Sequence, residues 1–113
     1  MLKKVKRRYL ALTIGSTAEI STGELMETIW GALTKLYGEY GASKTNLNLI
    51  SFDEKSKFAV LRTGHTSLEM VRTTLASITR KGDKHLAVHV LAVSGTIKAL
   101  YRRLPQEPFQ ESV

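Results

Sequence analysis

The sequence KHLAVHVLAVSGTIKAL, residues 84–100, decides the fold of this chain. Residues 86–93 are apolar except for His89, and their richness in valine and leucine predicts a strand that is buried on much of both faces. Ser94 and Gly95 end the apolar run at once. A short helix is predicted directly after them. Ser94 would cap this helix, Ile97 and Leu100 would anchor it, and Pro105 would stop it.

The turn between this strand and this helix combines two features that attract anions. Backbone N–H groups left free at a helix start favour negative charge. Lys98, Arg102 and Arg103 add positive charge nearby. The turn therefore predicts a place that holds a phosphate. The simpler alternative is that Ser-Gly-Thr at residues 94–96 is only a helix cap.

Three further strands are predicted upstream. Residues 9–14 alternate with period two, which puts Leu10, Leu12 and Ile14 on one side of a strand and Tyr9, Ala11 and Thr13 on the other. They follow a leader that carries five basic residues within residues 3–8. Runs around residues 46–52 and 57–63 are also typical of strands. The polar residues 53–56 lie between these two runs, which predicts a hairpin.

Two amphipathic helices are predicted between the strands. Residues 21–24 and 66–69 both have the spacing of a capping box, and each precedes an apolar stripe at helical spacing. Glycine commonly follows the last turn of a helix. Gly38 and Gly41 are therefore expected to stop the first helix, and Gly82 the second.

The predicted order is βαββαβ followed by an extra C-terminal helix. Short connections and right-handed crossovers favour one α/β arrangement for this order, a four-stranded antiparallel sheet with strand order 4-1-3-2 and two helices on one face. This ferredoxin-like arrangement also underlies the common RNA-recognition module, although a fold alone does not give a function. Residues 1–104 are expected to form one domain, and residues 105–113, with two prolines, are expected to form a loose tail.

Composition narrows the class of protein. The chain has 113 residues and a formal net charge of +7, from 17 lysines and arginines against 10 acidic residues. Such an excess indicates nucleic acid or another anionic partner, unless the charges form only a solvated face. Cysteine is absent, and we see neither a membrane-spanning run nor a signal peptide. We therefore expect a cytoplasmic protein without a membrane partner or a cofactor of its own.

The predicted topology brings basic residues from four distant segments to one edge of the sheet. The start of the first strand, the start of the second, and the ends of the third and fourth share this edge. Solvation alone does not explain such convergence, so we expect RNA or another polyanion to bind there. Ser43 is a further expected hydroxyl donor. The predicted RNA-binding residues are Arg7, Arg8, Lys44, Arg62, Ser94, Thr96, Lys98 and Arg102.

The aromatic motif of the RNA-recognition module is missing. Residues 57–62 read KFAVLR, which lacks the glycine and aromatic spacing used for base stacking. Tyr9 is a single candidate for stacking. We therefore expect recognition of RNA backbone and shape.

No catalytic or metal-ligating constellation is apparent. The three histidines, His65, His85 and His89, have neither a cysteine nor a close carboxylate pair that would complete a metal site. A small-molecule-binding regulatory domain of the same topology, dimerising by a sheet edge, remains an alternative. An acylphosphatase-like enzyme would need an arginine in the loop after the first strand, and residues 15–18, GSTA, have none.

Three motifs in order carry a resemblance to a known family. KRRYL at residues 6–10, GASK at residues 41–44 and VSGTIKAL at residues 93–100 resemble the archaeal ribonuclease P protein component 2, the counterpart of the eukaryotic Pop-five subunit. The resemblance covers roughly residues 5–104. It implies an RNA-recognition-like fold and membership of a ribonucleoprotein that removes the 5′ leader from precursor tRNA.

In that family the RNA is the catalyst, and magnesium is expected in the RNA active site. The resemblance implies that this chain is non-catalytic alone and acts with a larger, barrel-type protein subunit on the catalytic domain of the RNA. Met26, Trp30 and Tyr37 widen the apolar stripe of the first helix, so we also expect self-association or poor solubility until that subunit is present.

Overall fold

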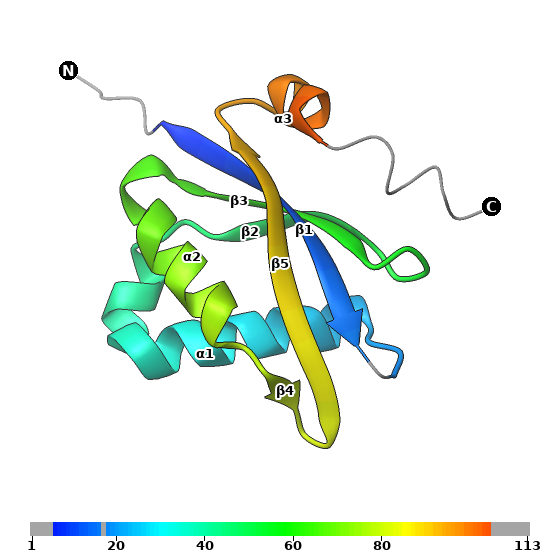
Figure 1. Cartoon of the computed structure of the whole chain (residues 1–113). Helices are drawn as coiled ribbons and strands as arrows, with labels where there is room; N and C mark the ends of the chain where they lie inside the picture. Colours follow the sequence, from blue (N-terminus) through cyan, green and yellow to red (C-terminus); the bar gives the residue numbers. More distant parts are fainter. Residues whose placement is uncertain (1–5, 17, 105–113) are drawn as a thin grey trace.

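The computed structural model describes residues 6–16 and 18–104, and its elements follow the predicted order with two additions (Figure 1). The additions are a single 3₁₀ turn, η1, and a two-residue strand, β4. The elements are β1 Arg7–Ser16, α1 Thr22–Ser43, β2 Asn48–Asp53, β3 Phe58–Gly64, η1 His65–Ser67, α2 Leu68–Ser77, β4 Arg80–Lys81, β5 Lys84–Ser94 and α3 Ile97–Arg103.

The predicted α/β class and strand order are confirmed. The sheet is antiparallel with the order β2-β3-β1-β5-β4, in which the four predicted strands have the neighbours expected of 4-1-3-2. The count of four strands is wrong in one detail, because β4 pairs through Arg80 and Lys81 with the first two residues of β5. Gly82, predicted to end the second helix, instead lies with φ 61° in the tight β4–β5 turn, where its backbone freedom is needed.

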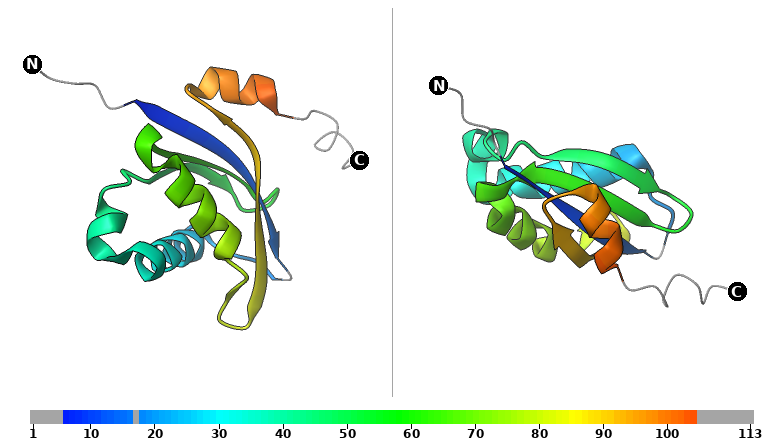
Figure 2. Two further views of the ribbon diagram at one scale, coloured as in Figure 1. Left: turned by 60° about the vertical axis from the view of Figure 1, so that its left-hand side comes forward. Right: turned by 90° about the horizontal axis from the view of Figure 1, so that it is seen from above.

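The alternation of β1 divides the molecule into two cores. Leu10, Leu12 and Ile14 are buried beneath α1 and α2. Ala11 lies on the opposite face and packs with Leu100 of α3. Figure 2 shows α1 and α2 on one side of the sheet and α3 near its upper end. Each fully buried leucine contributes about 1.5–3 kcal/mol to stability, so both layers hold the sheet in place.

Helix α1 begins as predicted but ends later. Ser21 and Glu24 form the predicted capping box, with Glu24 N donating to Ser21 Oγ at 3.2 Å and Ser21 N donating to Glu24 Oε1 at 3.0 Å. Gly38 interrupts the helix with φ 77° and ψ 169°, a backbone conformation open to glycine because it lacks a Cβ atom. The chain then resumes helical geometry to Ser43 and buries Ala42, so the prediction that Gly41 stops the helix is wrong.

The capping box predicted for the second helix is also wrong. Residues 65–67 form the turn η1, and no side chain caps α2. Ser67 is buried with φ −103° and ψ 7°, which is not the extended conformation that aims an N-cap hydroxyl at the helix. Helix α2 ends at Ser77, well before Gly82.

The prediction that β5 is buried on much of both faces holds only in part. Leu86 and Ser94 are buried, most other positions are half-buried, and His85 and His89 are exposed. The cause is the shortness of β4, which pairs only with Lys84 and His85 and leaves the outer edge of β5 open beyond them in the described structure.

The start of α3 corrects two assignments. Thr96, not Ser94, is the N-cap, because its hydroxyl accepts from Ala99 N at 3.1 Å. Leu100 anchors the helix as predicted, whereas Ile97 is 39% exposed and is no anchor. Pro105 and the predicted tail lie outside the described residues, as do Lys3 and Lys4. Among the described helices, none has both the length and the apolar character needed to cross a bilayer.

Candidate nucleic-acid interface

The strand registers bring the predicted basic residues to one end of the sheet. Arg7 lies opposite Gly64 at the β1–β3 end, and two residues further along Tyr9 lies opposite both Arg62 and Ser94. Directly opposed residues have Cβ atoms about 4.5–5.5 Å apart. The sheet therefore places Arg7 and Arg62 close to the β5–α3 turn. We call the surface formed by Arg7, Arg8, Lys44, Arg62, Lys98 and Arg102 the basic edge.

Lys44 reaches this surface through a pair of buried threonines. Thr45 O accepts from Gly64 N at 3.0 Å and from Thr63 Oγ1 at 2.7 Å, which fastens the end of α1 to the end of β3. Both threonines are fully buried. Lys44 itself is exposed, and its Nζ lies 4.8 Å from the centroid of the Tyr40 ring. This cation–π contact leaves the charge without a carboxylate partner among the described residues.

The basic edge has a charge on each side of the sheet. Arg7 shares the side of Tyr9 and Ala11, which α3 covers further along, because alternate strand residues face the same way. Arg8 faces the other side, donates through Nη1 to the carbonyl oxygen of Arg7 at 3.0 Å, and runs close to Gly95. The basic edge is therefore a rim around the sheet end, and positive charge is accessible from both faces.

The hydroxyls predicted to donate to phosphates are engaged within the protein. Ser94 is buried, and its Oγ donates to Thr96 O at 2.5 Å and accepts from Thr96 N at 3.1 Å. Ser43 Oγ donates to Tyr40 O at 2.7 Å. Thr96 Oγ1 is an acceptor in the α3 cap and is exposed, so its own proton stays free to donate. In this conformation Ser94 and Ser43 stabilise turns, and Thr96 alone among these hydroxyls can reach a ligand.

The basic residues of α3 divide into two groups. Lys98 and Arg102 are exposed and form no ion pair in the described part of the chain. Arg103 donates through Nη1 to the carbonyl oxygen of Val93 and so ties α3 to β5. Because α3 has only seven residues and a capped start, the positive side chains, and not the helix end, carry its attraction for anions.

Sequence reasoning missed two asparagines beside the predicted arginines. Asn46 and Asn48 line a hollow of about 210 Å³ together with Arg7, Arg62 and Gly64. We call this hollow the Arg-Asn hollow. Leu47 between the asparagines is buried, so both amides belong to the outward-facing side of the chain. The signal that could have found them is the N-L-N spacing at the start of β2, directly across the sheet from Arg62.

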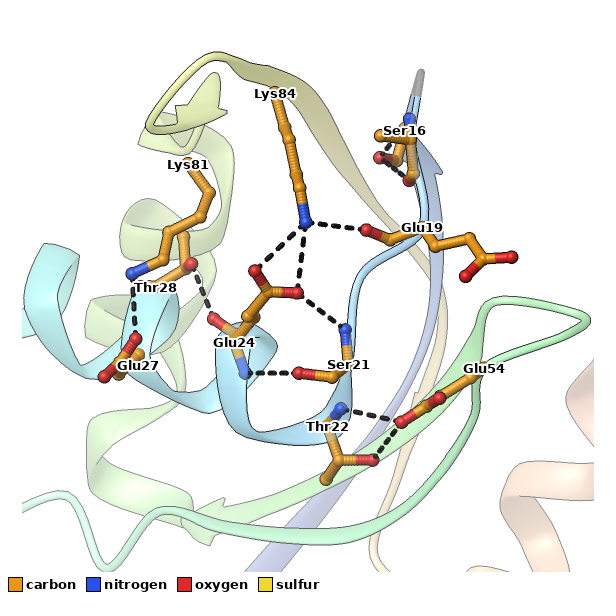
Figure 3. A network of polar contacts seen from close by, with 11 residues as sticks. Ser16, Glu19, Ser21, Thr22, Glu24, Glu27, Thr28, Glu54, Lys81 and Lys84 are labelled. Carbon is orange, nitrogen blue, oxygen red and sulfur yellow. Dashed lines mark hydrogen bonds and ion pairs between the residues drawn. The ribbon is translucent and has the colours of Figure 1, made fainter.

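Acidic residues accumulate at the opposite end of the molecule (Figure 3). Here Lys84 Nζ lies 3.0 Å from Glu24 Oε2 and Lys81 Nζ lies 2.9 Å from Glu27 Oε1. The pKa of Glu24 lies below its ordinary value because the backbone N–H of Ser21 and then Lys84 donate to its carboxylate. A ten-residue β1 spans about 30 Å between this end and the basic edge, so these lysine–carboxylate pairs lie far from the basic edge.

The start of α1 offers no free anion site. Glu54, from the β2–β3 hairpin, accepts from Thr22 N at 2.9 Å and from Thr22 Oγ1 at 3.2 Å. A hollow of about 740 Å³ lies beside it, lined by both carboxylates and lysines. The protein thus supplies its own anion to this helix start, in contrast to the basic edge.

The sheet face used for base stacking in RNA-recognition modules is largely covered. Leu100 of α3 packs with Ala11 and Val60, and Tyr9 and Leu104, the residue after α3, pack against this cluster. The rings of Phe58 and Tyr101 lie with centroids 6.4 Å apart at an interplanar angle of 39°. The candidate stacking residue Tyr9 is therefore half-buried, and the exposed strip of this face is the part that carries Asn48 and Arg62.

The histidines remain separate from one another. His65 Nδ1 lies 3.3 Å from the carbonyl oxygen of Lys6, and His85 and His89 are exposed on β5. Among residues 6–16 and 18–104, no three histidine or carboxylate side chains lie close enough to hold a metal ion.

The fold and the basic edge define a class of protein, a small ferredoxin-like α/β domain whose uncompensated charge suits a polyanionic partner. The chain belongs to the Rpp14/Pop5 family, whose model matches residues 8–104. It is similar to ribonuclease P protein component 2 of Pyrococcus horikoshii, with 34% identity over 98 residues that cover 87% of this chain and 82% of the relative. It is also similar to the protein of that name from Methanosarcina barkeri, with 30% identity, 84% of this chain and 69% of the relative.

A solved structure shares the fold. A chain in the cryo-EM structure of yeast ribonuclease MRP matches with a TM-score of 0.68 and 18% identity, covering 85% of this chain and 79% of that chain. The same layering of helices and sheet therefore persists at low identity. The sequence resemblance to archaeal ribonuclease P protein component 2 is confirmed by the family match and by these relatives.

Proposed function

We propose that this chain is a protein subunit of ribonuclease P, the ribonucleoprotein that removes the 5′ leader from precursor tRNA, and that it binds the catalytic RNA through its basic edge. Membership of the Rpp14/Pop5 family and the named relatives support the assignment. The observation that carries the mechanism is the convergence of Arg7, Lys44 and Arg62 from three segments at a sheet end where no carboxylate neutralises them in the described structure.

The basic edge acts by neutralising phosphates. A folded RNA brings its phosphates close together, and the resulting repulsion opposes the active conformation. Lysine and arginine side chains replace condensed counterions and so lower this repulsion. Arg7 and Arg62 can meet the RNA from one side of the sheet, and Arg8 and Lys44 from the other. The catalytic RNA then reaches its active fold at a lower salt concentration.

The chemistry of cleavage belongs to the RNA. Magnesium supplies charge stabilisation in the RNA active site when it is bound there. We infer that the part of this chain is to bind and position that RNA. We place this action in the cytoplasm.

An exposed apolar surface on α1 supports a protein partner. Leu36 is 47% exposed and Tyr40 is 74% exposed, with Tyr37 beside them. Met26 and Trp30 pack against the main core, so these two residues no longer count as surplus apolar surface. We propose that Leu36, Tyr37 and Tyr40 contact the barrel-type ribonuclease P subunit, or a second copy of the chain in its absence.

A reconstituted cleavage assay tests the proposed function. The chain is added to ribonuclease P RNA and the barrel-type subunit, and cleavage of precursor tRNA is measured against magnesium concentration. Addition of the wild-type chain should lower the magnesium concentration needed for half-maximal cleavage. The Arg7→Ala, Arg62→Ala double variant should lose most of this shift, while a Lys55→Ala, Arg80→Ala variant of equal charge should retain it. An identical shift for both double variants would contradict RNA binding at the basic edge.

A further inference from the structure

The Arg-Asn hollow collects four side chains whose hydrogen-bonding groups are unused. Arg7 comes from β1, Arg62 from β3, Asn48 from the start of β2, and Asn46 from the connection just before β2. In the part of the chain that the structure describes, none of these four side chains takes part in a hydrogen bond or an ion pair. The sequence contains only two asparagines, and both line this hollow. Unused polar groups from three strands thus surround one space.

The donors and acceptors around the hollow do not match a phosphate alone. A guanidinium group carries five N–H donors and no acceptor, which suits phosphate oxygens. A carboxamide carries two N–H donors and a carbonyl acceptor. A bare phosphate would satisfy the arginines but would offer no donor to the asparagine carbonyl oxygens. A nucleotide satisfies both kinds of group, because its phosphate accepts and its base edge both donates and accepts.

The size and the backbone of the hollow fit one nucleotide base. Its volume of about 210 Å³ is far above the roughly 15 Å³ that one water molecule needs, so the hollow has room for a group much larger than water. Asn48 lies directly opposite Arg62 in the β2–β3 ladder, so a carboxamide and a guanidinium flank the same space. Asn46 is held at φ 54°, a left-handed conformation that asparagine tolerates better than most residues.

We propose that the Arg-Asn hollow binds one unpaired adenosine nucleotide of the RNA, with Asn48 and Asn46 on the base edge and Arg7 and Arg62 on the adjoining phosphate. Unpaired bases in loops and bulges are the ones that proteins read by their edges. Asparagine forms a paired donor and acceptor contact with N6 and N7 of adenine, and pyrimidines have no N7 to complete such a contact. This inference rests on the proposed function and adds base selectivity to what would otherwise be backbone recognition.

The direct test uses four fluorescent RNA heptamers, UUUNUUU, in which N is A, C, G or U. Binding is measured by fluorescence anisotropy at a fixed low salt concentration. The heptamer with A should bind about tenfold more tightly than those with C or U, which lies within the range of one paired asparagine–adenine contact. Equal affinity for all four heptamers, or tightest binding of the one with G, would overturn the assignment.

Two variants connect the preference to the asparagines. Asn48→Ala removes a carboxamide from an exposed strand position, and Asn46→Gly removes the other while preserving the left-handed backbone. Both variants should bind the heptamer with A about as tightly as those with C or U. The salt dependence of binding should stay unchanged. Ser51→Ala, on the same strand and also exposed, is the matched control and should retain the preference. Retained preference in both asparagine variants would overturn the proposal.

The arginines separate this proposal from the function on which it rests. Arg62→Ala should weaken binding of all four heptamers and reduce the salt dependence. If the wild-type protein binds the four heptamers equally but Arg62→Ala still reduces the salt dependence, RNA binding at the basic edge stands and the adenosine site is wrong. If no heptamer and no ribonuclease P RNA binds in a salt-dependent way, the proposed function itself is wrong.

Discussion

Replacement of Arg62 with alanine should flatten the salt dependence of RNA binding without unfolding the protein. Arg62 is half-buried on β3 between the buried residues Leu61 and Thr63, and its side chain forms no ion pair in the described structure. Its neighbours in the ladder, Tyr9 and Asn48, keep their backbone pairing whatever side chain stands at this position. Loss of the guanidinium also relieves repulsion from Arg7, so the variant should be at least as stable as the wild type.

The size of the effect follows from counterion release. Each phosphate contact contributes about 0.7 to the slope of log affinity against log salt for single strands and about 0.9 for duplexes. Between 50 and 200 mM salt, one such contact accounts for about a threefold change in affinity. The ratio of wild-type to Arg62→Ala affinity should therefore shrink about threefold over this range. The magnitude of the slope should fall by about 0.7 to 0.9, the contribution of one phosphate contact.

The assay measures the affinity of ribonuclease P RNA at several salt concentrations, with folding checked by circular dichroism. Lys98→Ala should give a similar fall, because Lys98 is exposed on α3 beside the same sheet end. Arg80→Ala and Lys55→Ala are the controls, since both residues are exposed and lie near the acidic end. Equal slopes for all four variants would refute the reasoning that the basic edge is the RNA site.

Three further outcomes are expected. Glu24→Gln should destabilise the protein at pH 7, as measured by urea titration. Because the pKa of Glu24 is lowered in the folded state, the difference in stability between wild type and variant should shrink as the pH falls below about 4.5. A difference that does not depend on pH would contradict this prediction. Leu100→Ala should lower the free energy of unfolding by about 2 to 5 kcal/mol in the same titrations, because it removes the side chain that packs α3 against the sheet. A change near zero would show that this packing is dispensable for stability. Replacement of any one histidine by glutamine should leave the rate of reconstituted cleavage within a few-fold of wild type, and the positions to test are His65, His85 and His89. A loss of about 100-fold would assign that residue a catalytic role.

The sequence predicts the topology well because the signals are periodic and local. The alternation of β1 and the capping box at Ser21 depend on neighbouring residues, and the structure reproduces both. The errors arise where a pattern depends on burial. Thr66 and Glu69 fit a capping box by spacing, but residues 65–67 form the turn η1 and no side chain caps α2. Ile97 has the spacing of an anchor but is exposed.

The positive charge of the site is predictable from the sequence, but the directions and hydrogen bonds of its side chains are not. The strand order is enough to bring Arg7 and Arg62 together, because it fixes which strand ends are adjacent. The engagement of the Ser94 hydroxyl and the presence of Asn48 in the hollow depend on the bulges and turns that set each side chain's direction. The N-L-N spacing puts both amides on one face of the chain, but only the strand pairing shows that this face lies beside Arg62.

The buried bonds of Thr45 bear on the entropy of association. Thr63 Oγ1 and Gly64 N both donate to Thr45 O, and Thr45 Oγ1 donates to Ala42 O at 2.8 Å. The segment that carries Lys44 and Asn46 is therefore already ordered in the folded protein before any ligand binds. Ordering a mobile side chain at an interface costs about 0.5–1.5 kcal/mol, and mobile backbone costs more. Because folding has already fixed this backbone, only the side-chain tips have freedom left to lose when a partner binds.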